Sequence, residues 1–251
     1  EIGDSAYHAA SSLELLHTAS LIHDDVVDDS DKRRGQKSVN ALYDNKVSVL
    51  VGDFLLATSL KEAALTADIQ IVNLVAKLGQ NLSELSNINA SDFSEEVYFE
   101  VIRKKTAALF AACAEAGARS AHSSDEMAKK AYLLGEMIGI SFQIKDDIFD
   151  YYPSTEIGKP TANDMREGKL TLPALYVLNN TNDEKIKNLA FRIRSLEATK
   201  EEIDGFIDYV KDNGGMEYAR KIMVEYRNKA LDLLPPKTSL PLREALAAYI
   251  D

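Results

Sequence analysis

Long stretches of the chain place apolar residues at spacings of three and four, the pattern of helices that bury one face. Only 6 Pro and 12 Gly interrupt the 251 residues. The pattern predicts helices over Ser5–Asp28, Val39–Ala67, Ile69–Asn89, Ser94–Ala118, Ser124–Tyr151 and Thr171–Leu178, with several more in the last third. Ser94 and Ser124, each followed by two acidic residues, are typical helix N-caps. We therefore expect an all-α protein.

Several of these helices are apolar around much of their circumference. Ala6–Ile22 and Ala131–Ile144 are examples, and such helices occupy the centre of large bundles. Two segments, Asp29–Gln36 and Tyr152–Lys169, break the pattern because they are charged and rich in turn-forming residues. We expect a single domain over residues 1–251, with these two segments as loops.

Charge and composition narrow the classes of protein. The 40 Asp and Glu outnumber the 29 Lys and Arg, giving a formal net charge of -11, which argues against a nucleic-acid or anionic-membrane surface. No run approaches the roughly 20 apolar residues of a transmembrane helix. The single Cys113, in the apolar stretch Ala111–Ala114, excludes an internal disulfide and is predicted to lie in the core. These features predict a cytoplasmic protein without a transmembrane segment.

An acidic motif closes the first predicted helix. Asp24 and Asp28 lie one turn apart on one helical face, with Asp25 beside them. The preceding residues are largely apolar, so the three carboxylates sit at the end of a helix predicted to be buried. Such a cluster is costly unless it is protonated or bridged by cations.

The same D-D-x-x-D spacing recurs at Asp146, Asp147 and Asp150, again at the end of an apolar helix and again before a polar loop with basic residues. Carboxylate oxygens suit a hard cation, and Mg²⁺ commonly shares such ligands with substrate phosphates. An EF-hand is excluded because no D-x-[DN]-x-[DN]-G loop with a terminal Glu is present. The alternative is that both clusters are solvated helix ends. The repetition favours a magnesium site.

The strings Leu15–Gly35 and Phe142–Pro173, which contain both motifs, closely resemble the polyprenyl diphosphate synthases, and the resemblance spans almost the whole chain. It is greatest to octaprenyl and heptaprenyl diphosphate synthases. Class I terpene cyclases are similar at the first motif, but their second normally reads N-S-E or D-T-E. The resemblance implies a helical bundle of the isoprenoid synthase type with a central active-site cavity. It also implies a Mg²⁺-dependent prenyltransferase that condenses an allylic diphosphate with isopentenyl diphosphate.

The resemblance also implies roles for polar residues outside the two motifs. Arg33, Lys105, Lys159 and Lys169 would face the allylic diphosphate, and Arg34 would face isopentenyl diphosphate. Thr106 and Gln143, together with the carbonyl of Lys105, would stabilise the developing allylic cation. The alternative for each is a solvated charge or an ordinary polar group on a helix.

The implied chemistry is ionisation, condensation and elimination. The allylic diphosphate ionises to a delocalised carbocation, the double bond of isopentenyl diphosphate attacks it, and loss of a proton gives a longer allylic product. The released diphosphate is the expected base, and we interpret His17 and His23 as polar groups on the helix.

Product length is predicted from the helix that carries the first motif. Ala19 and Ser20 precede Asp24 by five and four residues, which places them roughly 6 to 8 Å along the axis beneath the metal site at about 1.5 Å per residue. Short-chain members of the family carry an aromatic residue there. The small side chains predict a deep pocket and a long polyprenyl product.

Two alternatives stay open. One is a geranylgeranyl or farnesyl diphosphate synthase with the same site; the other is a non-catalytic subunit of a hetero-oligomeric synthase, which would carry at least one degraded motif. The family begins with helices bearing a Gly-Lys-Arg motif for isopentenyl diphosphate, and no match precedes Asp24, so we expect the domain to lack them. A homodimer is implied, with the small residues of Ala107–Gly117 expected at the subunit interface.

Overall fold

The computed structural model describes residues 3–33, 35–84, 93–152 and 162–250, and the chain divides into two compact units. Unit 1 comprises residues 1–86 and 108–136, and unit 2 comprises residues 87–107 and 137–251. In the described ranges every element is helical except one short two-stranded ribbon. The prediction of an all-α protein is confirmed.

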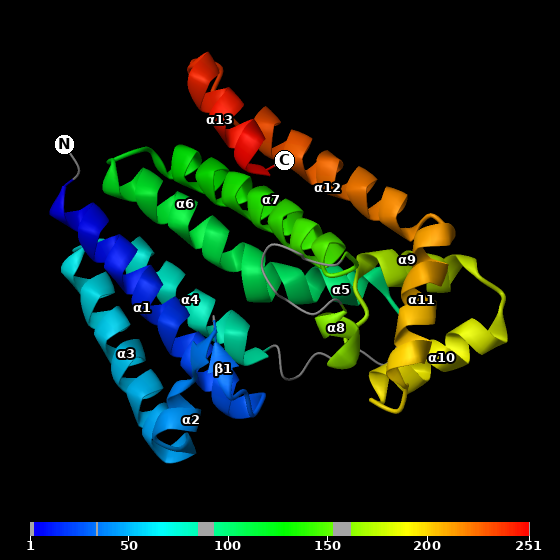
Figure 1. The fold of residues 1–251 in the computed structure, drawn as a ribbon. Helices are drawn as coiled ribbons and strands as arrows, with labels where there is room; N and C mark the ends of the chain where they lie inside the picture. The colour runs from blue at the N-terminus through cyan, green and yellow to red at the C-terminus, as the bar shows by residue number, and fades with distance from the viewer. Residues whose placement is uncertain (1–2, 34, 85–92, 153–161, 251) are drawn as a thin grey trace. The chain divides into compact units, whose positions relative to one another are not determined.

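In unit 1, α1 (Asp4–Val27) lies along α3 (Asn45–Leu65), as Figure 1 shows. Small residues allow this close approach. The hydroxyls of Ser12 and Ser59 each donate to the other residue's backbone carbonyl, at 2.9 and 2.8 Å. Near the end of α1 the ring of His23 packs directly on Gly52 of α3, where a β-carbon would overlap the imidazole. These contacts fix the end of α1 that carries the first motif.

The core of unit 1 forms where α4 (Ile69–Glu84) and α6 (Ala108–Ser120) pack, both also in contact with α1. Burial of each large aliphatic side chain here contributes about 1.5–3 kcal/mol. The stripe on α4 consists of Ile71, Leu74, Val75 and Leu78, and the stripe on α6 of Ala108, Ala112 and Ala116. These three alanines are buried within unit 1, and the expected subunit interface over Ala107–Gly117 stays a prediction.

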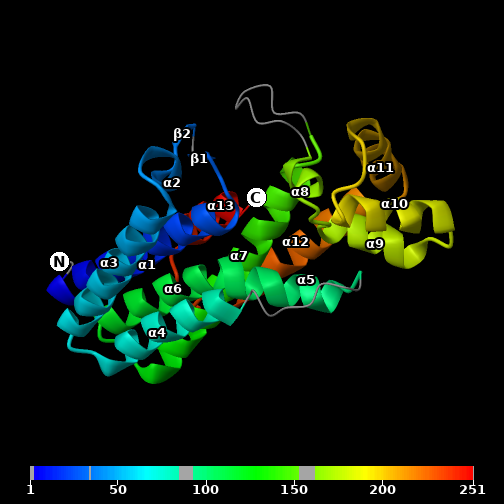
Figure 2. The same ribbon diagram turned by 90° about the horizontal axis from the view of Figure 1, so that it is seen from below.

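The helix predicted over Val39–Ala67 is two helices, α2 (Val39–Leu42) and α3. Asp44 separates them: its φ of 140° is incompatible with a continuing helix, and its carboxylate accepts a hydrogen bond from the N–H of Val47 at 2.8 Å. An antiparallel ribbon, β1 (Lys32–Arg33) and β2 (Gln36–Lys37), precedes α2. Figure 2 shows the ribbon and α2 on one side of the α1–α3 pair.

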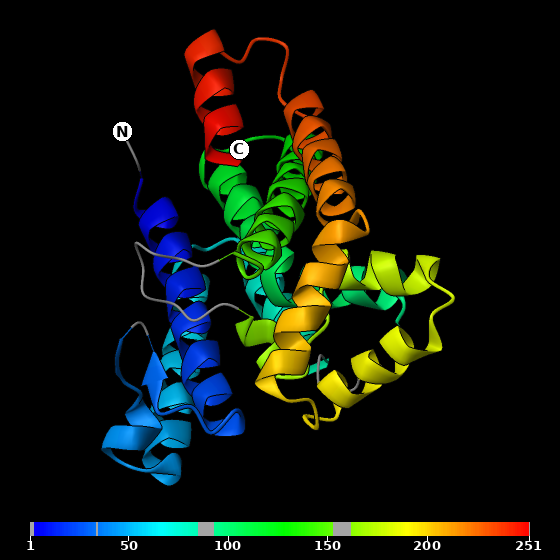
Figure 3. The same ribbon diagram turned by 45° about the vertical axis from the view of Figure 1, so that its right-hand side comes forward.

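Unit 2 contains α5 (Glu95–Ile102), the π-helical turn η2 (Arg103–Ala107), the second half of α7 (Asp125–Phe149), α8 (Asn163–Arg166), α9 (Leu172–Asn180), α10 (Glu184–Arg194), α11 (Lys200–Asp212), α12 (Gly215–Asp232) and α13 (Leu240–Ile250). The first half of α7 belongs to unit 1. Most of α9 is buried, and it packs on α12, α11 and α5. Figure 3 shows α12 and α13 as an antiparallel hairpin.

Both predicted serine N-caps are confirmed. Ser94 Oγ accepts from the N–H of Val97, and Ser124 Oγ accepts from the N–H of Met127, each at 3.3 Å. The helix predicted over Ser94–Ala118 is continuous to Ser120 but contains the π turn η2, which widens the helix by one residue.

The prediction that Cys113 lies in the core is wrong, because its side chain is exposed. Successive helical residues turn by about 100°, so Cys113 faces away from its buried neighbours Ala111 and Ala112. Partial desolvation nevertheless raises the pKa of the thiol, with a smaller contribution from Glu14.

Among the described residues, no helix has both the length and the apolar character needed to cross a bilayer.

Candidate active site

The first motif lies at the C-terminal end of α1 in unit 1. Its three carboxylates have different surroundings: Asp25 is 3% exposed, Asp24 is half-buried and Asp28 is exposed. The ribbon that follows returns Arg33 to Asp25, where Nε lies 2.9 and 3.0 Å from the two carboxylate oxygens and Nη2 lies 2.7 Å from Oδ1. These hydrogen bonds raise the pKa of the Arg33 guanidinium further. The first motif thus holds the guanidinium of Arg33 in a fixed geometry.

The second motif lies at the end of α7 in unit 2, and its middle aspartate is also 3% exposed. Asp147 Oδ2 accepts a hydrogen bond from Tyr98 Oη at 2.6 Å, and Oδ1 accepts one from Gln143 Nε2 at 2.8 Å. Burial raises the pKa of Asp147 to about 7, although both hydrogen bonds act in the opposite direction. Burial, followed by the charge of Asp147, raises the pKa of Tyr98 well above its ordinary value, so the phenol remains a donor.

The π turn η2 carries Lys105 and Thr106. Thr106 Oγ1 donates to Gln143 Oε1 at 2.6 Å. The exposed Lys105 side chain lines the same pocket as these two residues. A π turn breaks the regular hydrogen-bond ladder of an α-helix and is frequent at functional sites. Here it gives two consecutive residues access to one pocket.

Asp150, the last aspartate of the second motif, binds the segment that follows it. Its carboxylate accepts the backbone N–H groups of Asn163 and Asp164 at 3.1 and 3.0 Å, and its carbonyl accepts the N–H of Ala162 at 2.9 Å. Burial, and next the charge of Asp150, raise the pKa of Asp164 to about 6, while Lys169 lowers it. The contacts of Asp150 position the whole α8 turn.

The same turn orients Lys169. Its backbone N–H donates to the carbonyl of Asp164 at 2.7 Å, and its Nζ lies 2.6 Å from Glu167 Oε2. Gly168 between them has a φ of 74°, a conformation that L side chains rarely adopt.

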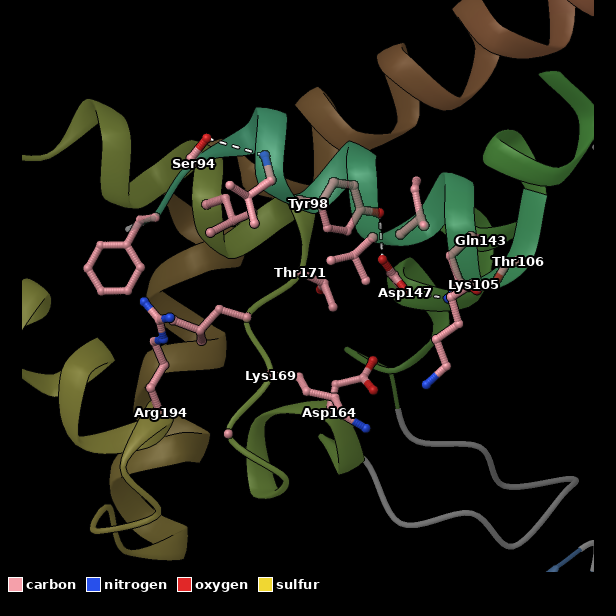
Figure 4. A pocket seen from close by; sticks show the side chains of 17 residues that line it. Ser94, Tyr98, Lys105, Thr106, Gln143, Asp147, Asp164, Lys169, Thr171 and Arg194 are labelled. Atoms are coloured by element: carbon pink, nitrogen blue, oxygen red, sulfur yellow. Dashed lines mark hydrogen bonds between the residues drawn. The ribbon is translucent and has the colours of Figure 1, made fainter. Parts of the chain in front are cut away.

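A pocket of about 490 Å³ lies in unit 2 beside the second motif and the π turn (Figure 4). Its apolar lining includes Val97, Val101 and Ile102 of α5 and Leu175 of α9. The sequence-predicted residues that line it are Lys105, Thr106, Gln143, Asp147 and Lys169. Its other lining residues are Phe93, Ser94, Val97, Tyr98, Val101, Ile102, Asp164, Gly168, Leu170, Thr171, Leu175 and Arg194.

The other predicted residues lie elsewhere. Asp146 is exposed at the end of α7. In α1, Ala19 is buried and Ser20 is half-buried, with the Ser20 hydroxyl donating to the carbonyl of His17 at 2.8 Å. Arg34 and Lys159 lie outside the described residues.

Sequence reasoning did not single out two polar residues of the pocket, Tyr98 and Asp164. Tyr98 precedes Lys105 by seven residues, two helical turns, so it shares a face with that lysine, and this spacing was an available signal. Asp164 stands in the charged segment after the second motif, but it falls outside the D-D-x-x-D pattern.

Among the described residues, no three His, Cys, Asp or Glu side chains form a ready-made metal chelate. A preformed cage is not what Mg²⁺ requires, because it commonly binds one or two carboxylates, water and substrate phosphate. In the first motif the exposed Asp28 and the half-buried Asp24 provide hard oxygen donors of this kind, and in the second motif the exposed Asp146 does. The chemistry of the donors in each motif therefore fits Mg²⁺.

A sequence model of the Polyprenyl synthetase family matches residues 1–210. Component 2 of heptaprenyl diphosphate synthase from Geobacillus stearothermophilus is 35% identical over 255 residues, covering 97% of this chain and 78% of that relative.

Solved structures of the same kind align over nearly the whole chain. Geranylgeranyl pyrophosphate synthase from Bacteroides thetaiotaomicron aligns with a TM-score of 0.84 at 53% identity, covering 100% of this chain and 80% of that one. A polyprenyl synthase from Caulobacter crescentus, complexed with calcium and isoprenyl diphosphate, aligns with a TM-score of 0.84 at 32% identity, covering 98% of this chain and 80% of that one.

Proposed function

Because the chain belongs to the polyprenyl synthetase family, we propose that it condenses an allylic diphosphate with isopentenyl diphosphate to make a long-chain polyprenyl diphosphate. One observation supports this most directly. A single pocket brings a cationic side chain, Lys105, together with the acceptor oxygens of Thr106 and Gln143 beside the carboxylate of Asp147. Such a pocket suits a substrate that separates into a diphosphate anion and a carbocation.

The cationic side chains would bind the leaving diphosphate. Breaking the C–O bond leaves both electrons of that bond on the diphosphate, so positive groups favour the transition state over the intact substrate. Lys105 and Lys169 line the pocket, and Arg33 is held at the first motif by Asp25. Arg34 and Lys159 complete the proposed set.

The acceptor oxygens would stabilise the carbon that becomes positive. Thr106 Oγ1 and Gln143 Oε1 carry lone pairs near the pocket, and their dipoles favour a cation. The double bond of isopentenyl diphosphate then supplies two electrons to form the new carbon–carbon bond. A proton leaves the adjacent carbon, for which the released diphosphate is the proposed base.

Mg²⁺ is the proposed metal, held by the first motif (Asp24, Asp25, Asp28) and the second motif (Asp146, Asp147, Asp150). When bound, it neutralises diphosphate charge and polarises the bond that breaks. The calcium and isoprenyl diphosphate bound by the Caulobacter crescentus relative support a divalent ion beside a diphosphate. The buried Asp25 and Asp147 already accept hydrogen bonds from protein groups, so the more open Asp24, Asp28 and Asp146 are the favoured ligands.

The long product is proposed from Ala19 and Ser20, neither of which carries a bulky side chain. A heptaprenyl relative at 35% identity agrees with it. The 53% identity to a geranylgeranyl pyrophosphate synthase favours a second candidate, a C20 product from the same site.

The proposal includes one isoprenoid synthase domain over residues 1–251, a cytoplasmic enzyme and a homodimer. The name of the Geobacillus stearothermophilus relative, component 2, instead supports a hetero-oligomer. Sizing of the purified protein with and without candidate partners distinguishes the two assemblies.

The test of function is chromatography of products made from labelled isopentenyl diphosphate with farnesyl diphosphate and Mg²⁺. We expect a ladder ending in a long polyprenyl diphosphate. A product that stops at geranylgeranyl diphosphate selects the second candidate, and no incorporation by the folded protein contradicts both.

A further inference from the structure

Three hydrogen bonds run in one line from α5 through α7 to η2 (Figure 4). Tyr98 Oη lies 2.6 Å from Asp147 Oδ2, Gln143 Nε2 lies 2.8 Å from Asp147 Oδ1, and Thr106 Oγ1 lies 2.6 Å from Gln143 Oε1. The four side chains come from three elements and line one pocket. Their contacts form one connected unit.

Chemistry fixes the direction of every bond in this line. In its ionised form Asp147 only accepts hydrogen bonds, so the Gln143 amide turns its NH₂ group toward Asp147 and its oxygen away. The hydroxyl hydrogen of Thr106 is then used on that oxygen, which leaves the Thr106 oxygen as an acceptor. The three hydrogens used in these bonds therefore all point along the line toward Asp147, and lone pairs remain at the Thr106 end.

Tyr98 restrains the Asp147 carboxylate, which sets the direction of the other hydrogen bonds in the line. Asp147 is 3% exposed, so water does not replace a lost partner easily. Tyr98 is 8% exposed and its ring packs edge-on against Phe99, which limits movement of the phenol. The Tyr98 hydroxyl thus restrains rotation of the Asp147 carboxylate, and through it the orientation of Gln143.

We propose that Tyr98 is a positioning residue that, through Asp147 and Gln143, aligns acceptor oxygens toward the allylic cation. This inference rests on the proposed function and deepens it. Tyr98 need not touch the substrate, because its effect passes through the carboxylate that it binds. Its removal weakens recognition of a positive carbon more than recognition of the intact allylic diphosphate.

The test compares two ligands by calorimetry at one Mg²⁺ concentration. One is an allylic diphosphate analogue in which protonated nitrogen replaces the carbon that becomes positive, and the other is its neutral carbon isostere. The wild-type protein should bind the ammonium analogue more tightly. In Tyr98→Phe this preference should fall by about tenfold while affinity for the neutral isostere changes less than about threefold, with a parallel fall in kcat rather than a rise in KM.

Tyr218→Phe is the matched control. Tyr218 also donates from its phenol to a carboxylate, Glu95 Oε2 at 2.7 Å, and also connects to α5, but neither residue lines the pocket. It should leave the preference for the ammonium analogue unchanged. Thermal unfolding of both variants reports how much each loses in stability.

A double-mutant cycle tests the route of the effect. In a Gln143→Leu background, Tyr98→Phe should have little further influence on the preference, because the group it positions is gone. If Tyr98→Phe does not fold, Asp147→Asn tests the same step, since a carboxamide accepts or donates and no longer dictates the amide orientation. A full preference in folded Tyr98→Phe or Asp147→Asn overturns the inference and leaves the proposed function standing, whereas a wild-type protein without any preference contradicts the function itself.

Discussion

Arg33 binds Asp25 through two of its nitrogens: Nε contacts both carboxylate oxygens and Nη2 approaches Oδ1 to 2.7 Å. The Arg33 side chain is 37% exposed while the Asp25 carboxylate is buried, so the guanidinium binds Asp25 and remains accessible to solvent. The aspartate at the same place in the second motif, Asp147, is likewise buried and bound by protein donors. In both motifs the second aspartate is buried and accepts hydrogen bonds from protein side chains: Asp25 from Arg33, and Asp147 from Tyr98 and Gln143.

Arg33→Lys should weaken binding of the allylic diphosphate. Lysine retains the charge but lacks the planar fork that contacts Asp25 at two points and leaves donors for phosphate. We expect KM for the allylic substrate to rise about tenfold or more, measured at saturating isopentenyl diphosphate. Arg192→Lys removes a comparable fork at the surface pair with Glu202 and should not change KM. Equal KM values in both variants would contradict the role of Arg33.

Lys105 and its neighbour Lys104 form a natural comparison. Lys105 lines the pocket, whereas Lys104 Nζ pairs with Glu100 one turn away at 3.0 Å. Lys105→Ala should lower kcat/KM by about 100-fold or more, because a cation near the leaving diphosphate is lost. Lys104→Ala should cost no more than about 0.5 kcal/mol of stability and little activity. Steady-state kinetics of the two variants decide whether the charge or its position matters.

Ala19→Phe should shorten the product. The new ring would occupy space beside α1 where the prenyl chain is proposed to pass, so elongation should stop earlier. Ala10→Phe is the control, because Ala10 lies on the same helix but is exposed. Chromatography of the products, with thermal unfolding to verify folding, reports the outcome. A product of unchanged length from folded Ala19→Phe would contradict the proposal that the growing prenyl chain passes beside Ala19.

Stability of the metal-free protein should decrease with rising pH around neutrality. Asp147 has a pKa of about 7 in the folded protein and about 4 when unfolded. The folded state therefore holds this proton more tightly, so the stabilisation is complete at low pH and is lost as pH rises through 7. Between pH 6 and pH 8 this single group should remove about 1 kcal/mol. Urea unfolding in chelator should show this slope, and Asp147→Asn should reduce it by that amount.

Gly135→Ala and Gly205→Ala should change stability in opposite directions. A β-carbon at Gly135 would overlap the backbone carbonyl of Phe110, because α6 and α7 approach closely there. Nothing lies within 4 Å of a β-carbon at Gly205 in α11. We expect a loss of about 1–3 kcal/mol at position 135 and a gain of about 0.5–1 kcal/mol at position 205. Chemical denaturation measures both, and two changes of the same sign would contradict this packing.

Helix periodicity was enough to predict the class of fold and most helix positions. The helix predicted over Ser124–Tyr151 is observed over Asp125–Phe149, because a serine N-cap and an apolar repeat are local signals. The break at Asp44 was missed although Asp is a good N-cap, since apolar residues continue on both sides of it. The π turn at Arg103–Ala107 was also missed, because it depends on hydrogen-bond register and has no distinctive composition.

The candidate site could be predicted only in part. The motif predicted Asp147 and the family resemblance predicted Gln143, and the two side chains meet in one pocket. The contact of Asp147 with Tyr98 joins residues 49 positions apart on two helices, and no spacing along one helix reveals it. The sequence also does not reveal which aspartate of each motif is buried. In both D-D-x-x-D motifs it is the second one, Asp25 or Asp147, and this depends on packing and not on the pattern.

The imidazole of His23 stands where a side chain at position 52 would be, immediately before the first aspartate of the motif. The two positions therefore share one volume, and their substitutions are coupled. In a library randomised at both sites, variants that retain His23 should retain Gly52, while larger residues at 52 should survive only beside a smaller residue at 23. The identity of the residue before the first motif is thus set partly by a residue 29 positions later in the chain.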